Sequence, residues 1–383
     1  MKTLFKNGNV IPISSKPFVG DVLIEDGKIK EVGKITNEDA EIVDLNGKYL
    51  LPGFIDAHSH IGLYEEGVGM VYASDGNEMT DPLTPNVRAW DAFNPADPAI
   101  KRALKGGVTT VMILPGSANV VGGQGAIVKL NPTNVDKMLV KAPAGMKMAF
   151  GENPKMVYKD QKKTPSTRLG VAATARDFFM KVQDYMVEKE MAEKEGKPFT
   201  KRNSKYEIGE MVLKGKIPAR IHAHRADDIL TAIRIAEEFH FKFVIEHATE
   251  GYKIVDVLKE KKVPVVAGPL LTFRTKYELK DMTMEALKIL NENGVLAALM
   301  CDHPVIPLEY ASIQAATALR YGSKEEDLLK MLTVNPATIL GMEKRIGTIE
   351  KGKDADLVIW DGHPFDARST VESVYVDGKK ISL

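Results

Sequence analysis

Cysteine is almost absent from this chain of 383 residues, in which Cys301 is the only one. A disulfide within the chain is therefore impossible, and a zinc site built on several thiolates is not expected. An excess of charge of one sign is also missing, because 52 basic side chains balance 52 acidic ones. This balance argues against a general nucleic-acid binder and against a protein that binds membranes through a basic surface.

Long apolar runs are absent as well. No run reaches the ~20 residues that a bilayer-spanning helix needs. Residues 1–8 lack the apolar core and the small-residue cleavage site of a secretion signal. We therefore expect a soluble, cytoplasmic protein without a membrane partner. Its length suffices for one large domain and a smaller unit.

Both ends of the chain have the pattern of short antiparallel strands. In residues 1–50, β-rich segments are separated by the turns Asp26-Gly27 and Asn46-Gly47, and the tail has a similar turn at Asp377-Gly378. Asp-Gly and Asn-Gly between such segments indicate hairpins. We predict that residues 1–50 and 345–383 together form a small composite β-sandwich domain.

The middle of the chain, residues 51–344, has a different pattern in which apolar segments alternate with amphipathic ones. Apolar strands that alternate with helices indicate a parallel sheet buried on both faces, and about eight such units favour a (β/α)₈ TIM-like barrel. The predicted strands are Gly53–His60, Val108–Leu114, Ala126–Val128, Met146–Glu152, Ala219–His224, Phe243–His247, Val263–Ala267 and Val295–Asp302.

Histidines gather at the ends of these predicted strands. The run Leu51-Pro52-Gly53-Phe54-Ile55-Asp56-Ala57-His58-Ser59-His60 ends in two histidines, which share one face of a strand. Six of the eight histidines lie at predicted strand ends, where the active site of such a barrel is built. Neutral imidazoles suit a divalent metal such as zinc, so the set predicts a metal site. The predicted strand-end residues are His58, His60, Glu152, His222, His224, His247 and Asp302.

Because side chains alternate between the two faces of a strand, we can predict which residues at each strand end face the metal site. In the fourth strand Glu152 shares the face of Phe150, whereas Lys147 falls on the other face. In the sixth strand His247 shares the face of Ile245. We therefore predict that Glu152, and not Lys147, reaches the metal site.

The chain resembles the amidohydrolase superfamily, in particular its imidazolonepropionase-like branch of metal-dependent hydrolases. The stretches that carry the resemblance are Leu51–His60, Gly107-Val108-Thr109-Thr110-Val111, His222-Ala223-His224, Ile245-Glu246-His247-Ala248, Asp302 and the tail stretch from Gly347 to Val358. Together they cover nearly the whole chain.

The resemblance implies a role for each matching residue. His58 and His60 are implied to be the metal pair of the first strand, and His222 and His247 the ligands of the fifth and sixth. Asp302 would touch one metal and transfer the proton, while His224 would contact the substrate or serve as a further ligand. One departure concerns the lysine, carboxylated by carbon dioxide, that many members place at the end of the fourth strand. The sequence has Gly151-Glu152-Asn153-Pro154 there, so Glu152 is expected to bridge two ions or to bind one.

The predicted chemistry is attack by a metal-bound hydroxide on a carbon–nitrogen bond of an amide, a lactam, an N-acyl compound or a dipeptide. Asp302 would serve as general acid and base, and His224 would help to polarise the attacked bond. Arg225 could clamp a substrate carboxylate, and Tyr158 could donate a hydrogen bond to an oxyanion.

Three readings of the function stay open at this point. The first is the amidohydrolase just described, the second is a deaminase that releases ammonia from an amino-heterocycle, and the third is a non-catalytic binding protein. The expected cofactor is one or two divalent ions, zinc first, with Mn, Fe, Ni or Co as alternatives. The expected partner is a small-molecule substrate, and a homo-oligomer is left open.

Overall fold

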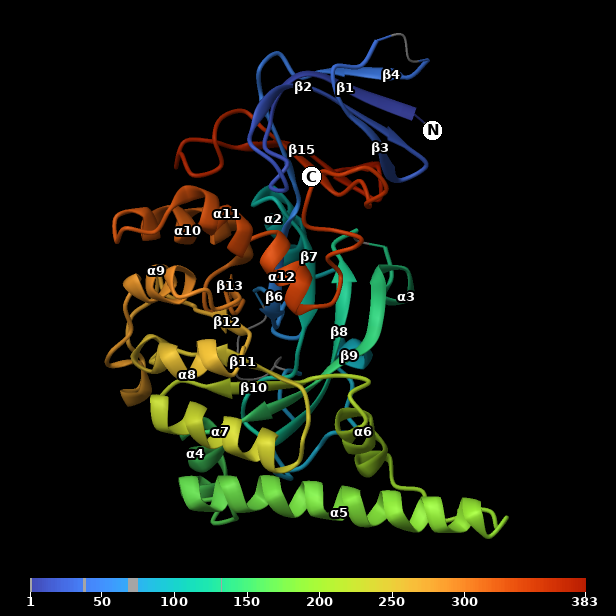
Figure 1. The fold of residues 1–383 in the computed structure, drawn as a ribbon, viewed down its shortest axis with the longest axis vertical. Coiled ribbons are helices and arrows are strands. Elements are labelled where there is room, and N and C mark those ends of the chain that lie inside the picture. The colour runs from blue at the N-terminus through green and yellow to red at the C-terminus, as the bar shows by residue number, and fades with distance from the viewer. Residues whose placement is uncertain (1, 37–38, 68–74, 132) are drawn as a thin grey trace.

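The structure, a computed structural model, describes the whole chain except residues 1, 37–38, 68–74 and 132. Its strands form two sheets of eight strands each. One sheet builds a barrel, and the other is formed by both ends of the chain, so that the two termini lie at the same end of the molecule (Figure 1). The predicted fold class, a barrel with a composite β unit from both termini, is confirmed.

All eight predicted barrel strands are present, and they lie side by side in chain order. They are β6 (Phe54–Ser59), β7 (Val108–Ile113), β8 (Val121–Lys129), β9 (Leu139–Ala149), β10 (Ala219–Ala223), β11 (Phe243–His247), β12 (Val265–Ala267) and β13 (Ala297–Leu299). The sheet is nearly closed, since β6 lies beside β13, where the Cys301 amide donates a hydrogen bond of 2.8 Å to Asp56 Oδ2.

The barrel is not wholly parallel, which corrects the sequence-based expectation. Strand β8 is antiparallel to both β7 and β9. The connections explain this: residues 114–120 join β7 to β8 without a helix, and residues 130–138 hold only the short helix α3 (Val135–Met138). A parallel crossover needs a dozen or more residues, so neither connection can return the chain to the start of the neighbouring strand.

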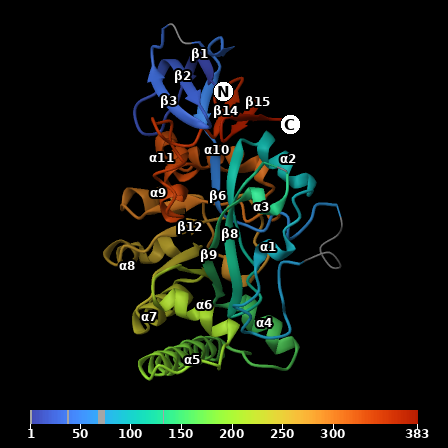
Figure 2. The same cartoon turned by 90° about the vertical axis from the view of Figure 1, so that its right-hand side faces the viewer.

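Helices cover the outside of the barrel, and the 27-residue helix α5 lies at the end of the molecule opposite the terminal sheet (Figures 1 and 2). The other helices and 3₁₀ turns are α1 (Ala89–Ala92), α2 (Pro98–Lys105), α4 (Glu152–Asp160), α5 (Arg168–Lys194), α6 (Ser204–Leu213), α7 (Ala226–Glu238), η1 (Gly251–Ile254), α8 (Val255–Glu260), η2 (Tyr277–Leu279), α9 (Glu285–Glu292), η3 (Leu308–Tyr310), α10 (Ala311–Leu319), α11 (Glu325–Met331) and α12 (Val334–Ile339). None of the helices in the described part of the chain is long and apolar enough to cross a membrane.

Alternation along the strands divides the core into two clusters. Met112, Val244 and Ala298 belong to an inner cluster together with residues of α12. Their chain neighbours Ile113 and Ile245 belong to the outer cluster, which includes the buried faces of α5 and α7. The strands are therefore apolar on both faces, as a barrel wrapped by helices requires.

The terminal sheet has the strand order β16-β15-β14-β5-β1-β2-β3, with β4 paired to β1. Its strands are β1 (Lys2–Val10), β2 (Phe18–Glu25), β3 (Lys28–Gly33), β4 (Glu41–Asp44), β5 (Tyr49–Pro52), β14 (Leu357–Trp360), β15 (Val371–Val376) and β16 (Lys379–Ile381). Phe5 and Tyr375 lie on strands that are not neighbours, yet their ring centroids are 4.9 Å apart, so the sheet curls around its own core.

The boundary between the two units follows from the strands. Strand β5 ends at Pro52 within the terminal sheet, and β6 begins the barrel at Phe54. The division into residues 1–50 plus 345–383 and residues 51–344 stays a prediction, and we propose Gly53 as the point of transition.

A buried ion cluster joins the two units. The ammonium of Lys129, at the end of β8, lies 2.8 Å from Asp354 Oδ2 and 2.9 Å from Asp356 Oδ2, and it also pairs with Asp377. Burial opposes charge on Lys129, yet the three carboxylates raise its pKa. The pKa of Asp354 falls to about 2 despite burial, because Lys129, Lys28 and Arg345 bind it.

Replacement of this lysine should destabilise the protein. Lys129→Met leaves Asp354 and Asp356 buried without their shared cation, and removal of one partner from a buried ion pair costs about 3 kcal/mol or more. We expect a loss of that size in the free energy of unfolding, measured in urea. The control Lys201→Met removes an exposed pair with Glu188 and should change the free energy by less than about 0.5 kcal/mol. Equal losses in both variants would show that the cluster does not hold the units together.

Candidate active site

The ends of the barrel strands bring together two groups of possible metal ligands among the described residues. One group is His222, His224 and His247, and the other is His58, His60 and Asp302. Within each group the potential ligand atoms lie within 4.8 Å of one another. Six of the seven strand-end residues predicted from the sequence are thus gathered at one place in the fold.

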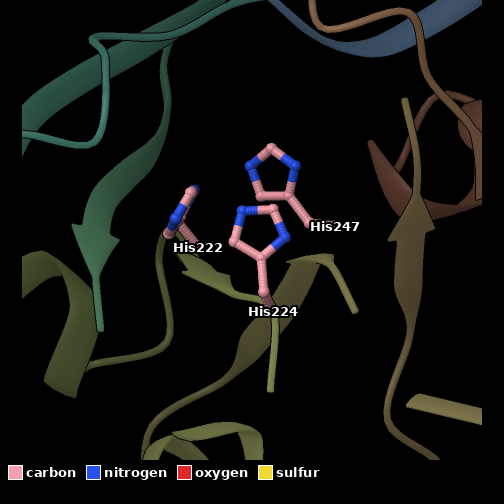
Figure 3. Close-up of side chains that lie close together, drawn as sticks. All are labelled: His222, His224 and His247. Carbon is pink, nitrogen blue, oxygen red and sulfur yellow. The ribbon is translucent and has the colours of Figure 1, made fainter. Parts of the chain in front are cut away.

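The first group consists of three imidazoles that point toward one another from β10, its following loop and β11 (Figure 3). The ring centroids of His222 and His247 are 4.3 Å apart, and His224 lies 4.6 Å from His222 and 4.5 Å from His247. Burial lowers the pKa of all three, to about 3 for His247. The rings are therefore neutral at pH 7, the form that binds metal.

The second group lies beside the first, since His58 and His247 have ring centroids 5.2 Å apart. Asp302 Oδ1 lies 3.3 Å from His58 Nε2 and 3.2 Å from His60 Nε2. The neighbouring histidines hold the pKa of Asp302 well below its usual value, although burial alone would raise it. Asp302 is therefore ionised over the physiological range.

Hydrogen bonds orient several of these rings. His60 Nδ1 lies 2.7 Å from the Leu114 carbonyl, and His247 Nδ1 lies 2.9 Å from the Gly268 carbonyl. A carbonyl only accepts, so Nδ1 carries the proton in both rings and Nε2 keeps its lone pair for the site. Such outer contacts to ring N–H groups are typical of metal-binding histidines.

The unsatisfied atoms of the cluster fit a cation. Neither ring nitrogen of His222 has a hydrogen-bond partner in the described structure, and Asp302 Oδ1 has none either, although all three atoms are buried. A buried polar atom without a partner costs about 1–3 kcal/mol. Imidazole nitrogen and carboxylate oxygen are ligands that zinc and similar divalent ions accept, so the residues present fit a metal.

Lys147 lies beside His58 of the second group, contrary to the prediction that it faces away, and its charge also lowers the pKa of the three histidines of the first group. Its ammonium is fully buried and lies 3.3 Å from His58 Nε2. Burial lowers the pKa of Lys147 to about 8, which raises the fraction of neutral amine near pH 7.

A second buried interaction, also not foreseen, fixes His58. Arg220 binds Glu246 through Nε and donates a 2.7 Å hydrogen bond to the Ala57 carbonyl. Glu246 Oε2 in turn lies 2.9 Å from His58 Nδ1. Although burial raises the pKa of Glu246, Arg220 and His58 lower it to about 2. The signal in the sequence was a charged residue inside each of two apolar strands, which burial requires to be paired.

The prediction for Lys147 and Glu152 failed because the backbone adopts left-handed φ angles at or just after the strand ends. Gly151 has φ +88°, His247 has φ +69° and Asp302 has φ +52°, all in the left-handed region. Such a residue turns the chain and cancels the alternation counted from the strand. Within β11 the alternation holds, so Glu246 shares the inner face of Val244 and lies beside His58, while His247 reaches the same site from the turn.

The prediction that Glu152 lies on the fourth strand is wrong. Strand β9 ends at Ala149, and Glu152 is the first residue of helix α4. Its amide donates to Glu278 Oε1 at 2.5 Å, and its side chain joins neither group of possible ligands. Glu152 stays a predicted ligand that no contact in this structure supports.

The structure also does not bring Tyr158 and Arg225 to the cluster. The Tyr158 hydroxyl is buried and donates to Asn119 Oδ1, and burial raises its pKa. Arg225 precedes helix α7 and forms a two-pronged ion pair with Asp227, at 2.9 and 2.7 Å. Neither residue lines the cavity over the histidines.

That cavity has a volume of about 600 Å³, within the usual range for small-molecule sites. His60, His222, His224, His247 and Asp302 form part of its wall. The rest comes from helix α4 and from segments that follow the strands, and it includes Lys276, a residue that the sequence did not single out.

Comparison with known proteins identifies the family. The family model for the amidohydrolase family matches residues 49–381. The chain belongs to the amidohydrolase family. An amidohydrolase from Thermotoga maritima MSB8 has a solved structure that is 68% identical, with a TM-score of 0.98 over 99% of both chains.

Two curated relatives are more distant. The amidohydrolase tasK of Hapsidospora irregularis is 29% identical over 94% of this chain, which spans only 40% of that protein. The imidazolonepropionase of Thermoplasma volcanium is 23% identical over 89% of this chain and 83% of its own. Members of this amidohydrolase family are hydrolases of carbon–nitrogen bonds and are typically metal-dependent, so the predicted family and enzyme class are confirmed.

Glu246→Gln tests whether the buried ion pair positions His58. Glutamine leaves Arg220 without its carboxylate and loosens the ring, and loss of such an outer contact weakens metal binding by about 10- to 100-fold. We expect this loss in a chelator competition titrated with zinc. The control Glu237→Gln removes an exposed pair with Lys261 and should leave zinc affinity unchanged. Wild-type affinity in the Glu246 variant would refute the positioning role.

Proposed function

We propose that this protein hydrolyses a carbon–nitrogen bond in a small amide, lactam, N-acyl compound or dipeptide. The observation that carries the proposal is the adjacency of two ligand groups, with a buried lysine beside His58, at a cavity of substrate size. Zinc is the ion we propose first, because imidazole and carboxylate groups are its usual ligands, with Mn, Fe, Ni and Co as alternatives.

Five side chains would hold the metal. We assign His58, His60 and Asp302 to one ion, and His222 and His247 to a second. A divalent ion there would act as a Lewis acid and lower the pKa of a coordinated water. His224 remains for the substrate, since Thr249 Oγ1 fixes its Nδ1 at 2.7 Å and the ring lines the cavity.

Lys147 would complete the site as a carbamate. Its neutral amine attacks carbon dioxide to form one nitrogen–carbon bond, and the proton released passes to solvent. The product is a carboxylate on the lysine nitrogen, placed beside His58. This assignment gives Lys147 the role that the sequence had led us to expect of Glu152.

Asp302 would move the proton in the reaction. It is ionised and lines the cavity, so it can accept a proton from the attacking water and deliver it to the leaving nitrogen. The deaminase reading would use the same residue, and the products separate the two: free ammonia indicates deamination, whereas a new carboxylate with a retained amine indicates amide hydrolysis.

Asp302→Asn tests this role. Asparagine cannot take the proton, and loss of a general acid–base group costs about 10²- to 10⁴-fold in rate. We expect kcat to fall by that factor in a screen of metal-loaded enzyme against N-acyl amino acids, dipeptides, lactams and amino-heterocycles. Metal content must be measured in each sample, because Asp302 is also a proposed ligand. Near-normal turnover in a fully loaded variant would remove Asp302 from the mechanism.

Lys147→Met tests the carbamate separately. Native mass spectrometry of the wild type in bicarbonate should show the added mass of one carbon dioxide, which the variant should lack. Metal bound per chain should fall in the variant, and also in wild type prepared without carbon dioxide. Lys137→Met, on an exposed helix, provides the matched control. Full metal binding by wild type without carbon dioxide would contradict the carbamate.

A further inference from the structure

The cavity over the histidines has an uneven distribution of charge. Much of its wall is apolar and comes from helix α4, the turn η2 and two loops: Met156, Val157, Leu279, Met79 and Val305. Lys276 is the one lysine or arginine among the described residues that line the cavity. It lies in the loop after β12, on the same cavity as Asp302 and His224.

The ammonium of Lys276 keeps unused donors. Its Nζ donates a 2.7 Å hydrogen bond to Asn153 Oδ1, while Glu278 Oε2 lies 3.6 Å away, beyond hydrogen-bond length. A lysine ammonium has three N–H donors. Two of them therefore have no hydrogen-bond acceptor among the described residues, and the side chain borders the cavity.

Neighbouring polar groups hold the lysine in this place. Asn153 Nδ2, in helix α4, donates a 2.8 Å hydrogen bond to Ser117 Oγ, so Ser117, Asn153 and Lys276 form a row along the cavity wall. The lysine can only donate, which fixes Asn153 with its amide oxygen toward Lys276.

Glu278 is shared between Lys276 and Arg168, because its Oε2 forms an ion pair of 3.6 Å with Lys276 and has no hydrogen-bond partner among the described residues. Glu278 Oε1 accepts from Arg168 at 2.8 Å and from the Glu152 amide, and Arg168 also binds Asp228. Burial lowers the pKa of Lys276, although the carboxylates of Glu278, Asp302 and Glu152 oppose that shift. Arg225, which the sequence suggested as a carboxylate clamp, is also used in such a pair, since it binds Asp227.

We propose that Lys276 binds a free carboxylate of the substrate, with Ser117 and Asn153 beside it, and that the substrates are N-acyl amino acids or dipeptides with an apolar side chain. The inference rests on the proposed hydrolase function and narrows its substrate class. A single ammonium suits a monoanion, whereas a phosphate dianion usually requires several donors. The apolar wall of Met156, Val157 and Leu279 suits the side chain.

The kinetic test compares matched acids and amides. N-acetyl-L-leucine and L-alanyl-L-leucine are each paired with the corresponding C-terminal carboxamide. Wild type should prefer both acids. In Lys276→Met, kcat/KM for the acids should fall by about 10- to 150-fold, the range for a hydrogen bond to a charged group, with less than about threefold change for the amides. Lys276→Arg should retain most of the preference.

Two further variants serve as controls, one for the loss of any lysine and one in case Lys276→Met does not fold. Lys280→Met removes an exposed lysine that bonds the Tyr277 hydroxyl outside the cavity, and it should match wild type. Asn153→Asp places a carboxylate beside Lys276 without removing the lysine, and it should reduce the preference for acids as Lys276→Met does. It provides the test if Lys276→Met fails to fold.

Binding of the same acids and amides to metal-free protein, measured by calorimetry, separates the two proposals. Tighter binding of the acids that disappears in Lys276→Met supports the carboxylate site. If metal-loaded wild type nevertheless hydrolyses none of the four compounds, only the hydrolase proposal fails. Hydrolysis without preference for acids, or equal losses for acids and amides in Lys276→Met, would overturn the carboxylate site while the hydrolase stands. No lysine-dependent binding and no hydrolysis would overturn both.

Discussion

The position of the candidate site depends on a buried ion pair inside the barrel. Arg220 and Glu246 are fully buried on neighbouring strands, and each charge would be costly there without the other. Because Glu246 uses its second oxygen for His58, the same pair that satisfies Arg220 also fixes the ring beside Lys147 and Asp302. Glu246 therefore both neutralises Arg220 and orients the proposed ligand His58.

The strand ends then direct the remaining groups inward. Positive φ at His247 and Asp302 is unfavourable for residues with side chains, by about 1–3 kcal/mol each. The surrounding structure holds His247 in this conformation through its bond to the Gly268 carbonyl, and the closing contact of Cys301 with Asp56 holds the chain just before Asp302. The barrel thus supplies rigid strands, and strained turns at their ends aim the side chains.

The barrel strands could be predicted from the sequence, but the direction of β8 and the turns at the strand ends could not. Eight apolar segments were sufficient to locate every barrel strand, because burial on both faces is a local pattern. The reversed direction of β8 depended on connection length, which composition does not indicate. Counting faces through Gly151 placed Glu152 inward and Lys147 outward, whereas Lys147 lies beside His58 and Glu152 begins helix α4. Histidines at strand ends were easier to recognise, because two residues on one strand end reach the site despite a local turn.

Lys276 shows a different limit of sequence reasoning. Nothing near it in the chain marks a binding site, since its partner Asn153 lies in helix α4 and Ser117, which Asn153 contacts, lies in the loop after β7. Arg225 was the candidate from the sequence for binding a carboxylate, but a guanidinium that already pairs with acids, as in Arg225 and Arg168, has few donors left. Availability of donors, more than charge type, therefore decides which cation can meet a substrate. Only the three-dimensional account of hydrogen bonds reveals that availability, because the sequence shows the charges without their partners.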